Sequence, residues 1–103
     1  MLDLGQIEGF QWDAGNSGKN EGKHGVGDRE AEQVFFNKPV LLDDPKHSAR
    51  EPRSHAVGLT DDGRLLHVSF TLREEGKLIR VISARPLNRK ERTLYDEETK
   101  ADP

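Results

Sequence analysis

The stretch RSHAVGLTDDGRLLHVSFTLREEGKLIRVISA, residues 53–84 of a 103-residue chain, predicts three strands joined by two tight turns. Apolar and polar residues alternate from 64 to 72, which is typical of a strand with one face on a core. The triplets Asp61-Asp62-Gly63 and Glu74-Glu75-Gly76 supply the turns. The third strand, from Lys77 to Ala84, is rich in β-branched residues. We therefore expect an antiparallel meander.

Shorter elements are expected before this meander. Residues 7–12 could form an edge strand, and Asp28 to Phe36 predicts a helix, with a short strand at Val40–Leu42 after it. Three glycines weaken any helix between Asp13, a candidate helix cap, and Lys23, so this segment is either a frayed helix or an ordered loop. Residues 43–52 are polar, contain two prolines and predict an exposed loop.

A helix is also expected after the meander. Asn88 and Glu91 have the spacing of a capping box, so the helix should run to about Glu97, with Leu87 and Leu94 packed on the sheet. The predicted fold is therefore α+β, a small antiparallel sheet flanked by helices. The length suits a single domain, 1–103, with its core from about 7 to 97 and flexible ends.

Composition excludes several classes of function. The chain has no cysteine, so it can form neither disulfides nor thiolate metal sites. The histidines match no zinc spacing, and we expect neither a metal nor a cofactor. The apolar runs are too short to span a membrane, and the first residues lack the pattern of a signal peptide, so a cytoplasmic location is expected.

Positive charge is concentrated in one window of an acidic chain. The net charge is −3, yet the window 77–92 carries +5, because one acid, Glu91, stands among six basic residues: Lys77, Arg80, Arg85, Arg89, Lys90 and Arg92. Such a window could form a cationic surface that neutralises phosphates, or simply a solvated strand edge and helix face. Composition alone leaves both interpretations open.

Two histidines could take part in chemistry. His24 follows Lys23 and could be a proton-transfer group tuned by that cation, or an ordinary surface histidine. His67 lies on the polar side of the central strand, where it could be structural or part of a polar groove. Tyr95 could stack on a base or pack its ring partly in the core.

The motifs taken together resemble the BrnT family of bacterial type II toxins. The matching pieces are FQWD at 10–13, KHGV at 23–26, GRLL at 63–66, IRVISAR at 79–85 and RKER at 89–92. Asn20, Arg53, Gly58, Thr71, Arg73 and Tyr95 match as single residues. In order and spacing the resemblance covers about residues 8–97.

This resemblance implies a RelE-like fold and a ribonuclease activity that arrests translation. It also implies a BrnA-type antitoxin with a ribbon-helix-helix motif, which neutralises the toxin. DNA would then be bound only indirectly, through the antitoxin, and RNA would be the substrate. A catalytically degenerate, toxin-like binding protein is the alternative, favoured by the glycines before Lys23 and by the net acidity.

Candidate roles follow from metal-independent RNA cleavage, which needs cations at one phosphate and one or two titratable groups. Proton transfer is assigned to Lys23, His24 and Glu91, and phosphate binding to Arg53, Arg80 and Arg85. RNA contact is assigned to Thr71, Arg73, Arg89, Lys90, Arg92 and Tyr95. Three structural alternatives stay open. Arg80 could form an ion pair with Glu91, Arg85 could bond loop carbonyls, and Glu91 could serve only as a helix cap.

Overall fold

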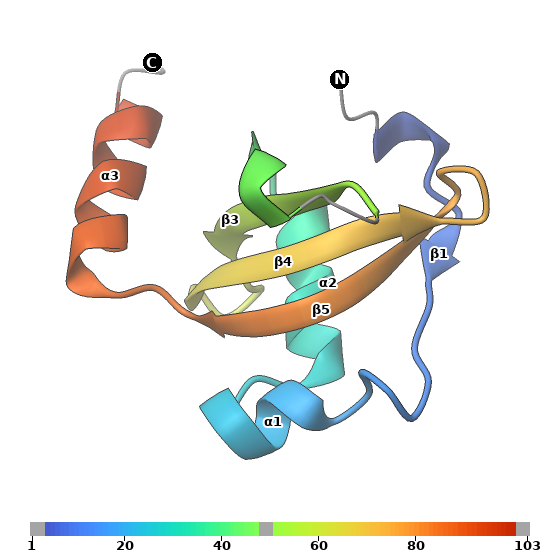
Figure 1. Ribbon diagram of the computed structural model, residues 1–103. Coiled ribbons are helices and arrows are strands. Elements are labelled where there is room, and N and C mark those ends of the chain that lie inside the picture. Colours follow the sequence, from blue (N-terminus) through green and yellow to red (C-terminus); the bar gives the residue numbers. More distant parts are fainter. Residues whose placement is uncertain (1–3, 48–50, 101–103) are drawn as a thin grey trace.

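The computed structural model describes residues 4–47 and 51–100 (Figure 1). A five-stranded sheet has the order β1-β5-β4-β3-β2. Its strands are β1 (Gly9–Phe10), β2 (Val40–Asp43), β3 (Arg53–Leu59), β4 (Leu65–Arg73) and β5 (Leu78–Pro86). The helices are α1 (Lys19–His24), α2 (Asp28–Phe36) and α3 (Arg89–Lys100), with short 3-10 turns at Leu4–Gln6 and Pro45–His47. The α+β prediction is confirmed.

The meander of β2 to β5 is antiparallel, as predicted, but β1 is not part of it. β1 pairs with β5 in parallel, with Gly9 opposite Leu78. The expectation of a purely antiparallel sheet is therefore corrected. β2, β3 and β4 lie between β1 and β5 in the chain, so no hairpin joins β1 to β5. Both predicted turns are present, and Gly63 and Gly76 adopt positive φ angles of 82° and 87° in them.

A β-bulge changes the register between β4 and β5. Ser69 lies opposite Ser83, whereas the next residue, Phe70, lies opposite Val81, so β5 holds one extra residue. Arg80 and Arg85 are an odd number of residues apart and would point to opposite faces of a regular strand. The bulge places them opposite Thr71 and His67, which share one face of β4.

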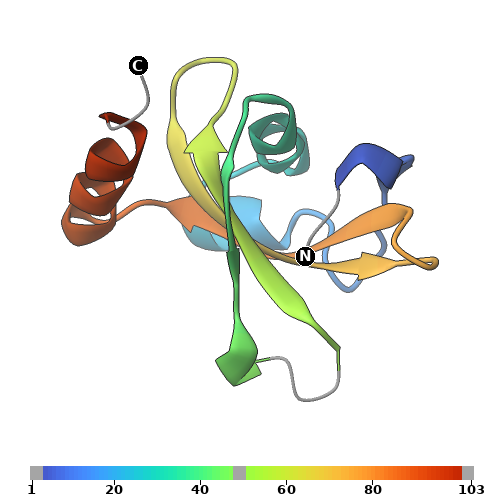
Figure 2. The ribbon, with the colours of Figure 1, turned by 90° about the horizontal axis from the view of Figure 1, so that it is seen from above.

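The other face of the sheet carries the core. Leu66, Val68 and Phe70 are fully buried there, together with Val34 of α2 and Val26, which follows α1. The rings of Phe35 and Phe70 meet edge to face, 4.9 Å apart. α2 lies behind β4 and β5 in Figure 1, and the view from above shows α3 on the other side of the strands from α2 (Figure 2). We call the side opposite the core the open face, which carries Arg53, His55, His67, Ser69, Thr71, Arg80, Ser83 and Arg85.

The segment before α2 resolves into turns and one short helix. α1 begins after Gly18 and ends at Gly25, both in left-handed conformation, so Gly25 stops the helix. Asp13 does not cap it, because α1 begins only at Lys19; the Asp13 carboxylate accepts the Gly15 amide and binds Arg80 instead. Gly27 rather than Asp28 is the cap residue of α2. Residues 48–50 of the expected loop lie outside the described residues.

α3 begins where the capping box predicts it. The Glu91 amide donates to Asn88 Oδ1 at 2.8 Å, and the Asn88 amide donates to Glu91 Oε1 at 3.0 Å. Leu87 is buried as expected, but Leu94 is 56% exposed, so it does not anchor the helix to the sheet. None of the residues of α3 is buried.

Replacement of Phe70 by alanine is expected to lower the free energy of unfolding by about 3–5 kcal/mol, because it leaves a cavity at the centre of the core. Urea denaturation measures this. Phe36→Ala is the control, since Phe36 is 76% exposed and should cost well under half as much. Equal losses for the two variants would contradict the core described above.

Candidate functional site

A bidentate ion pair joins the end of β5 to the first turn of α3. Arg85 donates from Nη1 to Glu91 Oε1 at 2.7 Å and from Nη2 to Glu91 Oε2 at 2.8 Å. Arg85 Nη1 also reaches the Pro86 carbonyl at 3.3 Å. A guanidinium has five N–H donors, so Nε and one Nη2 hydrogen have no partner among the described residues. Arg85 thus has N–H donors available for a ligand, while Glu91 fixes the orientation of its guanidinium.

Glu91 is held in its ionised form. The hydrogen bonds from Arg85, assisted by the Asn88 amide, lower the pKa of Glu91 to about 2. A carboxyl group with this pKa does not carry a proton near neutral pH and is a weak base. Its contacts therefore suit a role in capping α3 and orienting Arg85 better than the proton transfer assigned from the sequence.

His67 lies directly across the strand from Arg85 and is half-buried. Burial lowers the pKa of His67 below its usual value of 6.5, and the positive charge of Arg85 and the neighbouring His55 lower it further. Its Nδ1 atom is buried without a hydrogen-bond partner among the described residues. A neutral imidazole at this place is equipped to accept a proton.

A second histidine, His55, lies beside His67, with the ring centroids 4.6 Å apart. Its Nε2 atom lies 2.8 Å from Asp44 Oδ2, and its Nδ1 atom lies 2.9 Å from Ser69 Oγ. An ionised carboxylate only accepts hydrogen bonds, so Nε2 of His55 carries the hydrogen that bonds to Asp44. Sequence analysis missed this assembly, because its members are far apart in the chain and Asp44 lies in the segment expected to be an exposed loop.

Arg80 forms an ion pair, but with Asp13 and not with Glu91. Its Nη1 and Nη2 atoms donate to the two carboxylate oxygens of Asp13 at 2.9 and 3.0 Å, and Nη1 also donates to Gln11 Oε1 at 3.1 Å. The same hydrogen bonds lower the pKa of Asp13 and raise the pKa of Arg80. The pair joins β5 to the segment that follows β1.

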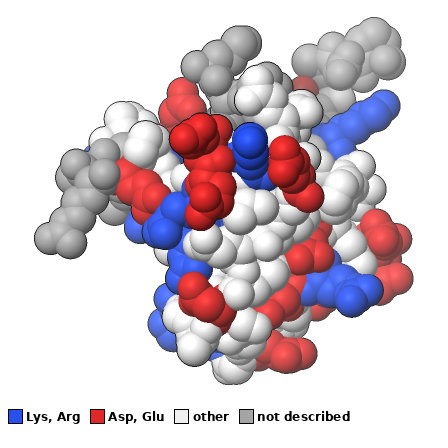
Figure 3. All heavy atoms as spheres, turned by 90° about the vertical axis from the view of Figure 1, so that its right-hand side faces the viewer, with Lys and Arg blue, Asp and Glu red and all other residues white. Residues whose placement is uncertain are grey.

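Several cations assigned to RNA therefore already have acidic partners. Arg73 donates from Nη2 to Glu51 at 3.0 Å, in addition to the pairs made by Arg80 and Arg85. Figure 3 shows acidic and basic side chains interspersed over the right-hand side of the molecule. By contrast, Arg89, Lys90 and Arg92 are exposed on the first turns of α3. The excess charge of the window 77–92 is thus concentrated at the start of α3.

The other residues assigned from the sequence lie on different sides of the sheet. Thr71 is buried on the open face between Arg53 and Arg80, and its hydroxyl donates to the Pro52 carbonyl at 2.7 Å. Lys23 and His24 are exposed at the end of α1, which lies below β5 in Figure 1, whereas α3 rises from the end of β5. Val26, which closely follows them, enters the core. The structure brings Arg53, Arg80, Arg85 and Thr71 to the open face and places Lys23 and His24 on the side of the core.

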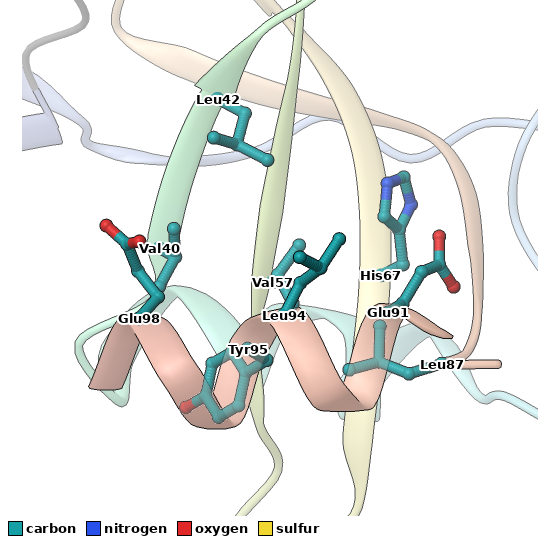
Figure 4. A pocket seen from close by; sticks show the side chains of 9 residues that line it. All are labelled: Val40, Leu42, Val57, His67, Leu87, Glu91, Leu94, Tyr95 and Glu98. Atoms are coloured by element: carbon teal, nitrogen blue, oxygen red, sulfur yellow. The ribbon is translucent and has the colours of Figure 1, made fainter. Parts of the chain in front are cut away.

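A groove of about 390 Å³ lies between α3 and the sheet (Figure 4). It is lined by Val40, Leu42, Val57, His67, Leu87, Glu91, Leu94, Tyr95 and Glu98. Residues 4–47 and 51–100 contain no group of three histidine, aspartate or glutamate side chains that could hold a metal ion. No helix in these same residues is long and apolar enough to span a membrane.

Glu91→Gln is expected to lower the free energy of unfolding at pH 7 by roughly 1 kcal/mol, as for a partly exposed ion pair. Because the folded pKa lies below the ordinary value of 4.5, the contribution is present above pH 4.5 and is lost as the pH falls towards 2. Urea unfolding should therefore show a clearly larger difference from wild type at pH 7 than at pH 2.5. Glu97→Gln, on the same helix, is the control, and a pH-independent difference for Glu91→Gln would contradict the assignment.

Comparison with known families agrees with the geometry. A family model described as "Ribonuclease toxin, BrnT, of type II toxin-antitoxin system" matches residues 12–91, well over half of the chain. The matched range includes every residue of the open face as well as the Arg85–Glu91 pair. A search of curated proteins gave no match. The chain therefore belongs to the BrnT family of ribonuclease toxins of type II toxin–antitoxin systems.

Proposed function

We propose that this protein is an endoribonuclease that cleaves RNA on its open face without a metal ion and so arrests translation in the cytoplasm. The observation that carries the proposal is the position of His67 directly across the strand from Arg85. A proton acceptor and a guanidinium with free donors thus lie side by side on the open face of the sheet, where His67 also lines the groove beside α3. Membership in a family of ribonuclease toxins supports the class of reaction.

The chemistry is an internal transesterification of RNA. His67 accepts the proton of a 2′-hydroxyl, the 2′-oxygen bonds to the adjacent phosphorus, and the bond from phosphorus to the 5′-oxygen breaks. The leaving 5′-oxygen takes a proton from water, and the hydroxide that remains takes the proton held by His67. Arg85 stabilises the negative charge that builds on the phosphoryl oxygens. The products are a 2′,3′-cyclic phosphate and a 5′-hydroxyl.

The arginines of the open face lie in two rows, and the spacing of these rows assigns them different phosphates. One row holds His67 and Arg85, and the other holds Arg53, Thr71 and Arg80. The rows meet β4 at His67 and Thr71, four positions apart, which is roughly 13 Å along a strand. Arg85 therefore serves the reacting phosphate, and the second row serves a neighbouring phosphate of the same strand. Exposed Arg89, Lys90 and Arg92 extend the path for the RNA backbone along α3.

A BrnA-type antitoxin with a ribbon-helix-helix motif is the proposed partner, and DNA is bound only through it. The family description supports a protein antitoxin, and the basic start of α3 offers a surface for acidic antitoxin residues. The proposal contrasts with a degenerate toxin that only binds its partner. That alternative gains support if the purified chain leaves RNA intact and its expression leaves growth unchanged.

Purified wild-type protein is expected to cleave single-stranded RNA equally with and without EDTA. Arg85→Ala should lose about 100-fold or more in rate, because it removes a donor to the charged transition state. Arg53→Ala should lose about tenfold, because it serves a flanking phosphate. Arg29→Ala, an exposed cation on α2, is the control. Cleavage that stops in EDTA would overturn metal independence.

Variants of His67 and His24 distinguish a reaction on the open face from a reaction near α1. With the reaction on the open face, His67→Gln should lower the single-turnover rate at least about 100-fold, while His24→Gln should retain it within about threefold. His67 acts in its neutral form, and its pKa is lowered from 6.5. The wild-type rate should therefore be maintained at pH 6.5 and should fall only at a lower pH. Burial is the largest cause of this lowered pKa; Arg85 on β5 and His55 on β3 lower it further, and Glu91 on α3 raises it. Loss of activity in His24→Gln alone would move the site to the α1 side.

A further inference from the structure

We infer that the groove beneath α3 is the docking site for the antitoxin, and that it receives a short segment with large apolar side chains and a lysine or arginine opposite Glu98. This inference rests on the proposed function only in taking a protein antitoxin as the partner. It adds the place of binding and the chemistry of the bound segment.

The groove is an apolar surface that the chain itself leaves uncovered. Leu42 of β2 is 51% exposed and Leu94 of α3 is 56% exposed, and both point into the space between the helix and the strands in Figure 4. Val40, Val57, Leu87 and Tyr95 complete the apolar lining. Exposed apolar side chains gathered in one groove are typical of sites that bind a protein partner.

α3 is supported at one end only. The Arg85–Glu91 pair and the Asn88 cap fix its first turn, but none of its residues is buried, and Leu94 and Tyr95 are its only large apolar side chains. A helix of about this length is marginal in water without tertiary packing. A segment that fills the groove would pack against α3 and the sheet together, and would supply the support that the chain lacks.

The groove also lies along a sheet edge. β2 is the last strand of the sheet, and among the described residues no strand pairs with its outer side. Val40 and Leu42 of this strand line the groove. An extended partner segment can bond to such an edge while its side chains enter a neighbouring pocket.

The charges of the groove favour a polypeptide over RNA. The lining includes the carboxylates Glu91 and Glu98 and no lysine or arginine, so it offers no cation to a phosphate, and RNA that reacts at His67 is held from outside the groove by Arg85. Glu91 is already paired with Arg85, which leaves Glu98 for a cation of the partner. The exposed Arg89, Lys90 and Arg92 nearby would attract acidic residues that flank the apolar segment. A segment bound here would also cover His67, and would thereby block the proposed reaction.

The test is isothermal titration of the purified chain with the antitoxin encoded beside its gene. Leu42→Arg and Leu94→Arg should each weaken binding at least tenfold, because each buries a charge in the apolar groove. Both side chains are exposed, so both variants should fold, which circular dichroism checks. Phe36→Arg, an exposed apolar position on α2, is the matched control and should bind as wild type does. Glu98→Lys should weaken binding more than Glu97→Lys does.

The outcomes separate this inference from the proposed function. Unchanged binding by both leucine variants, or an equal loss with Phe36→Arg, overturns the groove as the docking site, whether or not the chain cleaves RNA. Loss of binding in the leucine variants alone supports it, and the same variants should cleave RNA at the wild-type rate without antitoxin. Absence of RNA cleavage by wild type overturns the enzymatic proposal and leaves the result on the groove standing.

Discussion

The ion pair between Arg85 and Glu91 determines how the open face is built. It fixes the exit of β5, the start of α3 and the direction of the guanidinium at the same time. Because the carboxylate also accepts the Asn88 amide, the helix cap and the arginine share one anchor. The groove exists because this anchor holds the first turn of α3 against the sheet while the rest of the helix stands away from it. The site and the candidate docking surface thus depend on the same two side chains.

The bulge in β5 is the second constraint, and it has a direct bearing on chemistry. It allows Ile79 and Val81 to face the core while Arg80 and Arg85 both reach the open face. A regular strand could place only one of these two arginines on the open face, because side chains alternate between its faces. Bulges occur frequently next to functional sites, where they redirect a side chain. Here the redirected residue is Arg85, the one that lies beside His67.

Much of the fold could be predicted because its signals are local. The alternation in β4, the two turns and the Asn88–Glu91 spacing each depend on residues close in sequence, and the structure has all of them. The parallel pairing of β1 and the Arg80–Asp13 pair could not be predicted, because both depend on how distant segments meet. The same reason hid His55 and Asp44. The sequence also could not show that Lys23 and His24, the candidates for proton transfer, lie at the end of α1 and not on a strand of the open face. The sequence thus indicated which types of residue the candidate site contains, but not which residues lie next to one another in it.

The parallel pairing of β1 also bears on the order in which the chain folds. The contacts between β3, β4 and β5 close short loops, and such contacts form early at small cost in chain entropy. Gly9 and Leu78 are 69 residues apart in the chain, so their pairing closes a much longer loop than either hairpin does. The Arg80–Asp13 pair joins residues 67 apart in the chain, whereas the Arg85–Glu91 pair joins residues only six apart. The open face thus combines contacts that are local in sequence, which are expected to form early in folding, with long-range contacts that are expected to form late.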